Sequence, residues 1–169
     1  GADVLIKYKE LATQKMMSDE YLLKALANSE KDPFQHPLKT SGSKLIGTHI
    51  FPFKYTPEAP QDRQHSYITM DMQISREMDA HTNVVFFTFY IFSHKDIGLM
   101  KDEYGRVVSR MDYLTSRLYF LFKGSTDFGT SPMIFFETKP LFVQQNIPGM
   151  SMTFMIRDFA EYRDGRKEQ

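Results

Sequence analysis

Apolar residues recur at helical spacing over residues 105–128, which is the most regular pattern in the chain. The residues of this apolar face are Val107, Met111, Leu114, Leu118 and Leu121. Such spacing predicts an amphipathic helix of about four to five turns. Gly124 tolerates the left-handed conformation that often ends a helix. We therefore expect one long helix closed at Gly124, with Arg106, Arg110 and Arg117 along its polar flank.

Four segments have the pattern of β-strands. Residues 66–74 and 149–159 alternate apolar and polar positions, which is typical of strands with one buried face. Residues 83–93 are apolar at almost every position, so we expect a central strand covered on both faces. Residues 132–143 form a fourth strand, which Pro140 interrupts. Two of these strands precede the predicted helix and two follow it.

The front of the chain combines helical segments with loops. Residues 4–28 have two weakly separated apolar faces, so we expect one or two helices, with Ser18 as the N-cap of the second. This amphipathic arm is expected to dock onto the chain's own sheet. Residues 30–44 and 56–64 are rich in breakers and polar residues and predict loops. Between them, Gly47 and Pro52 limit the apolar piece to an edge or irregular strand.

These elements predict an α+β fold in which an antiparallel sheet, in β-β-α-β-β order, packs on one long helix. An N-terminal helical arm and long loops complete it. The expected division of the chain follows from the same pattern. It is a helical arm at 1–29, a loop-rich segment with room for a short edge strand at 30–65, an α+β core at 66–159 and a charged tail at 160–169.

The amino-acid composition mainly excludes certain classes of function and chemistry. The chain of 169 residues has 21 basic and 21 acidic side chains, so the basic excess of a typical nucleic-acid-binding protein is missing. A net charge near zero favours self-association. The sequence contains no cysteine, which excludes a disulfide framework and thiolate chemistry. Its longest apolar run, at 84–92, is too short to span a bilayer.

No catalytic signature stands out among the polar residues. The histidines lack the spacing of a zinc site. Asp79 with His81, and His94 with Asp96, are the best candidates for a general base, but solvated loops explain both pairs better. A small hydrolase that uses His81 or His94 therefore remains only an alternative. We expect no enzyme, no cofactor and no metal.

The segment at 124–129, Gly-Ser-Thr-Asp-Phe-Gly, superficially resembles a phosphate-binding loop. It follows a helix where such loops precede one, so a helix cap and turn explain it better. The arginine flank of the helix could bind an acidic partner, although a solvated face is an equal alternative. The strands carry more apolar surface than one helix can cover, which favours burial by the arm or by a neighbouring subunit.

Several segments resemble small neck proteins of tailed bacteriophages. They are LIKYKELATQKMMSDEYLLKALAN at 5–28, YITMDMQI at 67–74 and VVFFTFYIFSHK at 84–95. The closer likeness is RVVSRMDYLTSRLYFLFKGSTDFG at 106–129, followed by a strand pair that ends in PGMSMTFMIRDF at 148–159. This helix, elbow and strand ending is similar to that of tail-terminator or tail-completion proteins. The likeness covers about two thirds of the chain and leaves residues 30–65 unmatched.

The resemblance implies a structural virion protein without active site or cofactor. Such a protein forms a ring, commonly a hexamer, that caps the tail tube and joins it to the head connector, with DNA passing through. Its implied partners are its own copies, the tube protein and the connector or head-completion protein. The resemblance allows the tail sheath as a further partner. It implies no contact with a membrane and no sequence-specific binding of nucleic acid. Its implied location is the virion neck, and the host cytoplasm during assembly.

The resemblance also implies that the elbow at 124–129 and the arginine flank of the helix are interfaces. The candidate interface residues are Arg106, Arg110, Arg117, Asp127 and Phe128. A head-closure (stopper) or connector-adaptor protein is the alternative within the same class, because the same small α+β plan could serve there.

Overall fold

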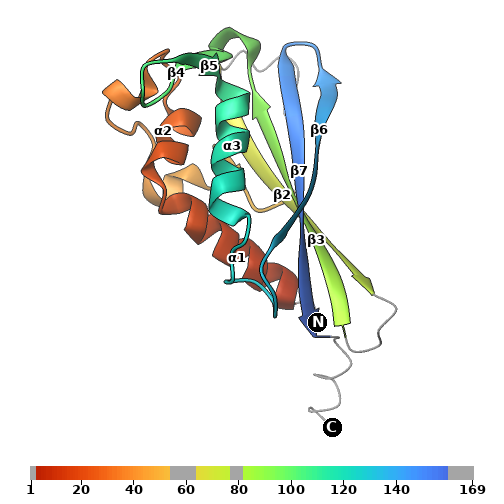
Figure 1. Cartoon of the computed structure of the whole chain (residues 1–169). Coiled ribbons are helices and arrows are strands. Elements are labelled where there is room, and N and C mark those ends of the chain that lie inside the picture. The colour runs from red at the N-terminus through yellow and green to blue at the C-terminus, as the bar shows by residue number, and fades with distance from the viewer. Residues whose placement is uncertain (1–2, 54–63, 77–81, 160–169) are drawn as a thin grey trace.

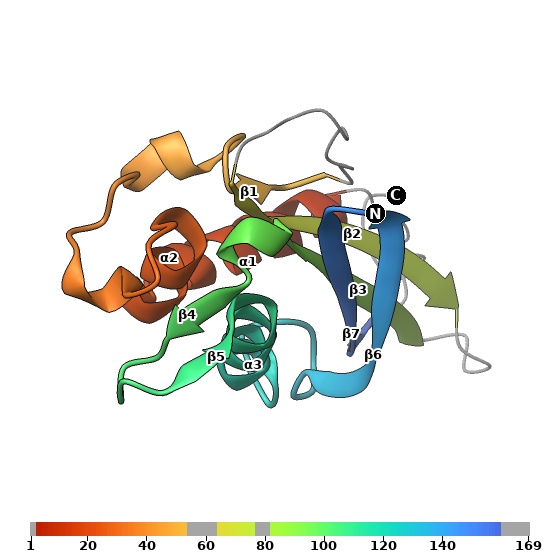
Figure 2. The ribbon, with the colours of Figure 1, turned by 90° about the horizontal axis from the view of Figure 1, so that it is seen from above.

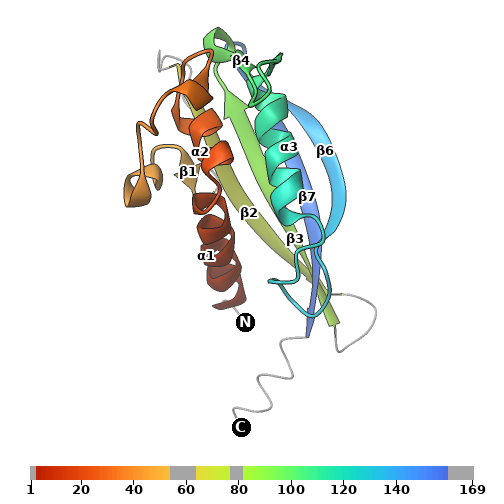
Figure 3. The same ribbon diagram turned by 60° about the vertical axis from the view of Figure 1, so that its left-hand side comes forward.

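The computed structural model describes residues 3–53, 64–76 and 82–159. Three α-helices lie on one face of a five-stranded sheet, as Figures 1 and 3 show. The helices are α1 (Asp3–Met17), α2 (Glu20–Ala27) and α3 (Arg110–Phe122). The sheet strands are β1 (Ile50–Phe51), β2 (Ser66–Arg76), β3 (Thr82–Ser93), β6 (Ile134–Gln144) and β7 (Ile147–Phe159). The predicted α+β class is confirmed.

The sheet has the strand order β1-β2-β3-β7-β6. All pairs are antiparallel except β1 with β2. A separate hairpin, β4 (Leu99–Lys101) and β5 (Val107–Ser109), lies between β3 and α3. Short 3₁₀ turns complete the chain: η1 (Pro33–Gln35), η2 (Gly42–Leu45) and η3 (Lys95–Ile97).

The long predicted helix is shorter at its start than its apolar spacing indicates. Ser109 caps α3, because its side chain accepts a hydrogen bond from the Asp112 amide. Residues 107–109 form β5 instead, so the helical pattern extended into a strand. Its end was predicted correctly: Gly124 follows the last turn with a φ of 75°.

The N-terminal segment forms two helices, and both pack on the sheet. Tyr8, Ala12 and Met16 are the buried residues of α1. The N-cap of α2 is Asp19, not Ser18, because the Asp19 carboxylate accepts the Tyr21 amide. The expected docking of this segment onto the chain's own sheet is confirmed.

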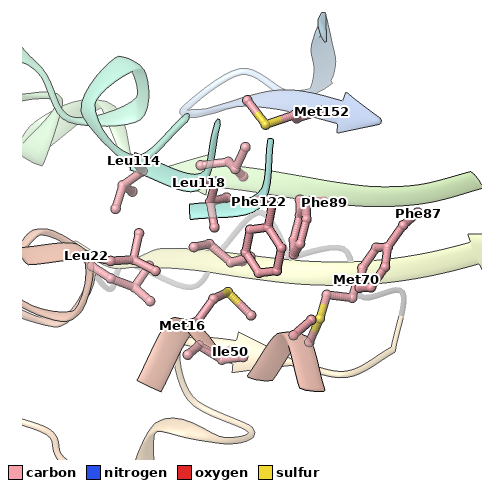
Figure 4. Packing of buried hydrophobic residues seen from close by; sticks show 14 of the residues in the cluster. Met16, Leu22, Ile50, Met70, Phe87, Phe89, Leu114, Leu118, Phe122 and Met152 are labelled. Carbon is pink, nitrogen blue, oxygen red and sulfur yellow. The ribbon is translucent and has the colours of Figure 1, made fainter. Parts of the chain in front are cut away.

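The core lies between the helices and one face of the sheet (Figure 4). Alternate residues of the strands point into it: Ile68 and Met70, then Phe87 and Phe89, then Met152 and Phe154. On α3, Leu114, Leu118 and Phe122 meet them at the spacing of a helix face. The inward alternation predicted for β2 and β7 is therefore correct.

The central strand β3 is covered along its inward face and in part on the opposite face, where Phe92 is buried in a second cluster with Phe51, Tyr67 and Ile147. Its inward residues Phe87, Phe89 and Ile91 are buried, whereas Phe86 and Tyr90 on the opposite face are half-buried. All three helices cover the inward face. The expectation of a strand covered on both faces is therefore correct for the end of β3 at Phe92 and wrong for its middle, where Phe86 and Tyr90 keep exposed surface.

Candidate interaction surfaces

Three arginines were predicted to share one exposed flank of the helix, but the structure gives them different places. Arg110 is fully buried, Arg117 is half-buried and Arg106 lies before the helix, in the β4–β5 loop. Each binds within its own chain. The flank is therefore not a row of free cations that await an acidic partner.

Arg110 is the first residue of α3, and its guanidinium holds the end of α2. It donates five hydrogen bonds, all to backbone carbonyls: Ala25 at 2.7 Å, Asn28 at 2.8 Å, Ser29 at 3.4 Å, Glu30 at 2.7 Å and Ile97 at 2.8 Å. These carbonyls include the negative end of the α2 dipole, which a cation stabilises. Burial lowers the pKa of Arg110 to about 10. Arg110 therefore joins two helices and leaves no surface for a partner.

Arg117, two turns further along α3, holds the other end of α2. Its guanidinium binds both carboxylate oxygens of Asp19, one of them at 3.1 Å. The hydrogen bond to Asp19 raises the pKa of Arg117. The same guanidinium lies 5.2 Å from the centre of the Tyr21 ring and 4.6 Å from that of Phe120. Arg110 and Arg117 together fasten both ends of α2 to α3.

Arg106 stabilises the loop of the β4–β5 hairpin. Its side chain and its amide both bind the buried Asp102 carboxylate, at 2.7 and 2.9 Å. Burial raises the pKa of Asp102, but the hydrogen bonds from Arg106 and Tyr104 outweigh it, so this pKa lies below its ordinary value. Arg106 remains exposed beyond this contact and stacks on the Tyr104 ring.

The elbow after α3 packs against α1 and β7. Phe128 is fully buried, with its ring 5.6 Å from that of Tyr8. Asp127 is exposed and pairs with Lys15 of α1 at 3.0 Å, which lowers the pKa of its carboxyl. Gly129 has a φ of 64°, and a Cβ there would lie 2.1 Å from the Arg157 carbonyl oxygen. Of the five predicted interface residues, only Arg106, Arg117 and Asp127 keep side-chain surface for a partner.

The histidine pairs give no support to a hydrolytic site. Asp79 and His81 lie outside the described residues. The His94 Nδ1 accepts the Asp96 amide at 3.1 Å and so caps η3, while the Asp96 carboxylate lies 3.8 Å away. Within residues 3–53, 64–76 and 82–159, no group of His, Asp and Glu side chains is placed to hold a metal ion. None of the helices described is long and apolar enough to cross a bilayer.

A hollow of about 330 Å³ lies between the β4–β5 hairpin and α3. Its walls carry Asp102, Glu103, Arg106, Asp112 and Arg117. Most of these charges already have a partner: Arg106 binds Asp102, Arg117 binds Asp19, and the Tyr113 hydroxyl donates to Glu103 at 2.6 Å. The burial of Tyr113 and its bond to Glu103 raise the pKa of this phenol. Because most of its charged side chains are already paired, this hollow resembles a surface groove more than a catalytic pocket.

Most of the large apolar side chains on the surface of the described residues lie in three places. The hairpin surface consists of Leu99, Tyr104 and Val107 with Phe120 of α3. The β1-edge surface consists of Ile6, Ile46, Pro52 and Phe53. The β6-edge surface consists of Ile134, Phe136 and Phe142. The sequence indicated a surplus of apolar surface on the strands but did not locate these three places, because an apolar residue in a strand or helix pattern is assigned to the core by default.

Comparisons with known proteins give a family and a partial structural likeness. The model of the YomW family matches residues 19–156. Among solved structures, a chain described as "Virion of native gene transfer agent (GTA) particle" is 12% identical. It covers 88% of this chain and 92% of its own length, with a TM-score of 0.47. No match was found among curated proteins.

Proposed function

This chain belongs to the YomW family, and we propose that it is a structural protein of a phage-type virion. In its specific form, the proposal is a tail terminator: a ring of copies, hexameric in the form that we favour, that caps the tail tube and joins it to the head connector. The resemblance of residues 106–129 and 148–159 to tail-terminator endings motivates the choice.

The observation that carries this proposal is the placement of exposed apolar side chains on three separate surfaces. Monomeric proteins rarely leave large apolar patches in water unless a partner covers them. Aromatic residues and arginine are also enriched in interfaces, and the hairpin surface has Tyr104, Phe120 and the adjacent Arg106 and Arg117. A ring protein between tube and connector needs surfaces for its own copies and for each neighbour.

Within this proposal the hairpin surface contacts the tube or the connector. The β4–β5 hairpin lies at one end of the fold, next to the start of α3 (Figure 1). It thus lies apart from both sheet edges and leaves them available for contacts between copies. Asp127, on the elbow at the other end of α3, is a further contact candidate of this proposal.

Binding to purified tail tubes tests the proposal. The tube protein encoded in the same genome is polymerised, mixed with this chain and imaged by negative-stain electron microscopy. We expect rings at tube ends and arrest of further tube growth. A variant with Val107→Ser and Phe120→Ser should lose this capping, and Lys95→Ser, on the exposed turn η3, is the matched control. Failure of the wild-type chain to bind tube ends would contradict the terminator role.

The same material separates the alternative within the class. A stopper or connector-adaptor protein would bind purified connector rings and leave tube growth unaffected. Rings that bind only to connectors would therefore support the stopper role in place of the terminator role. The virion role would stand in that case.

A further inference from the structure

The two edges of the sheet carry features that fit each other. β1 and β6 are the outermost strands, separated by β2, β3 and β7 (Figure 2). Four strand spacings correspond to about 19 Å, so side chains at the two edges do not meet within one copy. A contact between these edges requires two molecules.

The β6 edge presents a projecting aromatic side chain. Phe142 is 92% exposed, more than any other large apolar residue among those described. Ile134 and Phe136 on the same strand are 43% and 50% exposed. Because a buried phenylalanine removes about 150–250 Å² of surface from water, leaving Phe142 in solvent is costly unless a partner receives it.

The β1 edge presents an apolar hollow of about 370 Å³. Ile6 of α1, Ile46 and Pro52 form its apolar walls, and the rest of its lining is Lys9, Glu10, Thr13 and Gln14. Its lining differs from that of the hollow beside the hairpin, where charged side chains dominate. A phenyl ring suits apolar walls of this kind, and the size of the hollow allows one ring with its neighbours.

The charges around both features are balanced. Lys9 and Glu10 border the hollow, and Lys139 pairs with Glu137 on β6 at 3.3 Å. Each side brings one cation and one anion, so the contact joins neutral surfaces and leaves no net charge to be buried. A second copy of this chain meets the condition of neutrality, because its β6 edge and its hollow each carry one cation and one anion.

We propose that Phe142 of one copy inserts into the hollow formed by Ile6, Ile46 and Pro52 of the next copy. The contact joins two different patches, so a pair of copies keeps one free Phe142 and one free hollow, and copies are added head to tail until the ring closes. This inference rests on the proposed function, since it assigns the contact between copies of the ring.

Disulfide trapping tests the contact directly, because the chain has no cysteine of its own. Phe142→Cys and Ile46→Cys variants are prepared separately, mixed and oxidised. The mixture should form a disulfide-linked dimer at least about tenfold faster than a control mixture of Phe120→Cys with Ile46→Cys, because binding raises the local thiol concentration. The double variant Phe142→Cys/Ile46→Cys should give a ladder that ends at the ring.

Charge substitutions give an independent readout. Phe142→Asp and Ile46→Asp should each abolish assembly, while an equimolar mixture of the two should form dimers and nothing larger, since one intact Phe142 can still enter one intact hollow. Thermal melting checks that both variants fold, and Lys123→Asp, at an exposed residue outside the three apolar surfaces, should assemble normally. Trapping no faster than the control pair, or normal assembly of Phe142→Asp, would overturn the inference.

The results that test the Phe142 contact can be distinguished from those that test the proposed function. Rings that bind tube ends but show no trapping would overturn the Phe142 contact alone. Trapped rings that never bind tubes or connectors would overturn the virion role and leave the contact in place.

Discussion

Arg110 illustrates how a single charged residue can be structural. Its five hydrogen bonds to carbonyls join the end of α2, the 3₁₀ turn η3 and the first turn of α3. A guanidinium suits this place because it presents five N–H donors in a rigid plane, whereas an ammonium has three. Removing it leaves several buried carbonyls without a donor.

We therefore predict that Arg110→Met lowers the free energy of unfolding by about 3–5 kcal/mol, as expected when one side of a buried charged network is deleted. Arg110→Lys should lose less but still more than about 1 kcal/mol. Urea denaturation followed by circular dichroism measures both, with exposed Lys95→Met as the matched control. A loss for Arg110→Met as small as that of the control would show that the network contributes little.

His49 makes the stability depend on pH. Its ring is buried, its Nδ1 lies 2.9 Å from the Ser66 carbonyl oxygen, and it stacks on His65 with ring centres 3.8 Å apart. Burial, with a smaller contribution from His65, lowers the pKa of His49 from 6.5 to about 4. The unfolded chain therefore takes up a proton at a higher pH than the folded chain does.

The stabilising contribution of neutral His49 is complete above pH 6.5 and is lost as the pH falls toward about 4. We predict a loss of up to about 3 kcal/mol across this window. His49→Gln should flatten the pH profile of urea denaturation, and Lys123→Gln, at an exposed residue far from His49 in the chain, should keep it. An unchanged profile in His49→Gln would assign the pH dependence to other groups.

At the scale of elements, the elbow after α3 fixes how β6 begins. Its backbone lies against β7, where the Thr130 amide donates to the Arg157 carbonyl at 2.8 Å. Gly129 permits this approach, since both its positive φ and its close contact exclude a side chain. The elbow therefore needs glycine for two reasons that can be separated.

Comparison of Gly129→Ala with Gly42→Ala separates them. Gly42 has a similar φ of 60° but nothing within 4 Å of a Cβ. We predict that Gly42→Ala costs about 1 kcal/mol for the left-handed backbone alone. Gly129→Ala should cost at least about 2 kcal/mol more, as expected for overpacking against backbone. Equal losses in thermal or urea unfolding would mean that the elbow can move away from β7.

At the scale of the whole molecule, the layers leave both sheet edges and the hairpin apolar while the chain carries no net charge. Association through these surfaces is expected to depend on apolar burial more than on ion pairs. The fold thus provides a core on one face of the sheet and contact surfaces at its borders.

Assembly should therefore resist salt. We predict that raising NaCl from about 0.05 to about 0.5 M leaves the assembled fraction unchanged or increases it, because screening weakens exposed ion pairs but not apolar contacts. Mass photometry at a fixed protein concentration measures this fraction. Dissociation by salt would indicate that ion pairs, such as those of Arg106 or Lys139, hold the copies together.

The local pattern was enough to predict the α+β class, the helical front of the chain, the inward residues of β2 and β7, and the glycine at the end of α3. These features depend on periodicity and on backbone freedom, which neighbouring residues encode. The hairpin β4–β5 escaped prediction, because three-residue strands are too short to show a period. The same limit moved the predicted start of α3 to the wrong residue.

Tertiary structure alone decided which charged and apolar side chains are exposed. Arg110 has the sequence context of a solvated helix flank, yet it is buried because the end of α2 lies over it. Phe142 has the context of a core strand, yet it is exposed because β6 is the outermost strand and no described element covers its end. Burial depends on which segments distant in the chain come together, and that information is absent from any local pattern.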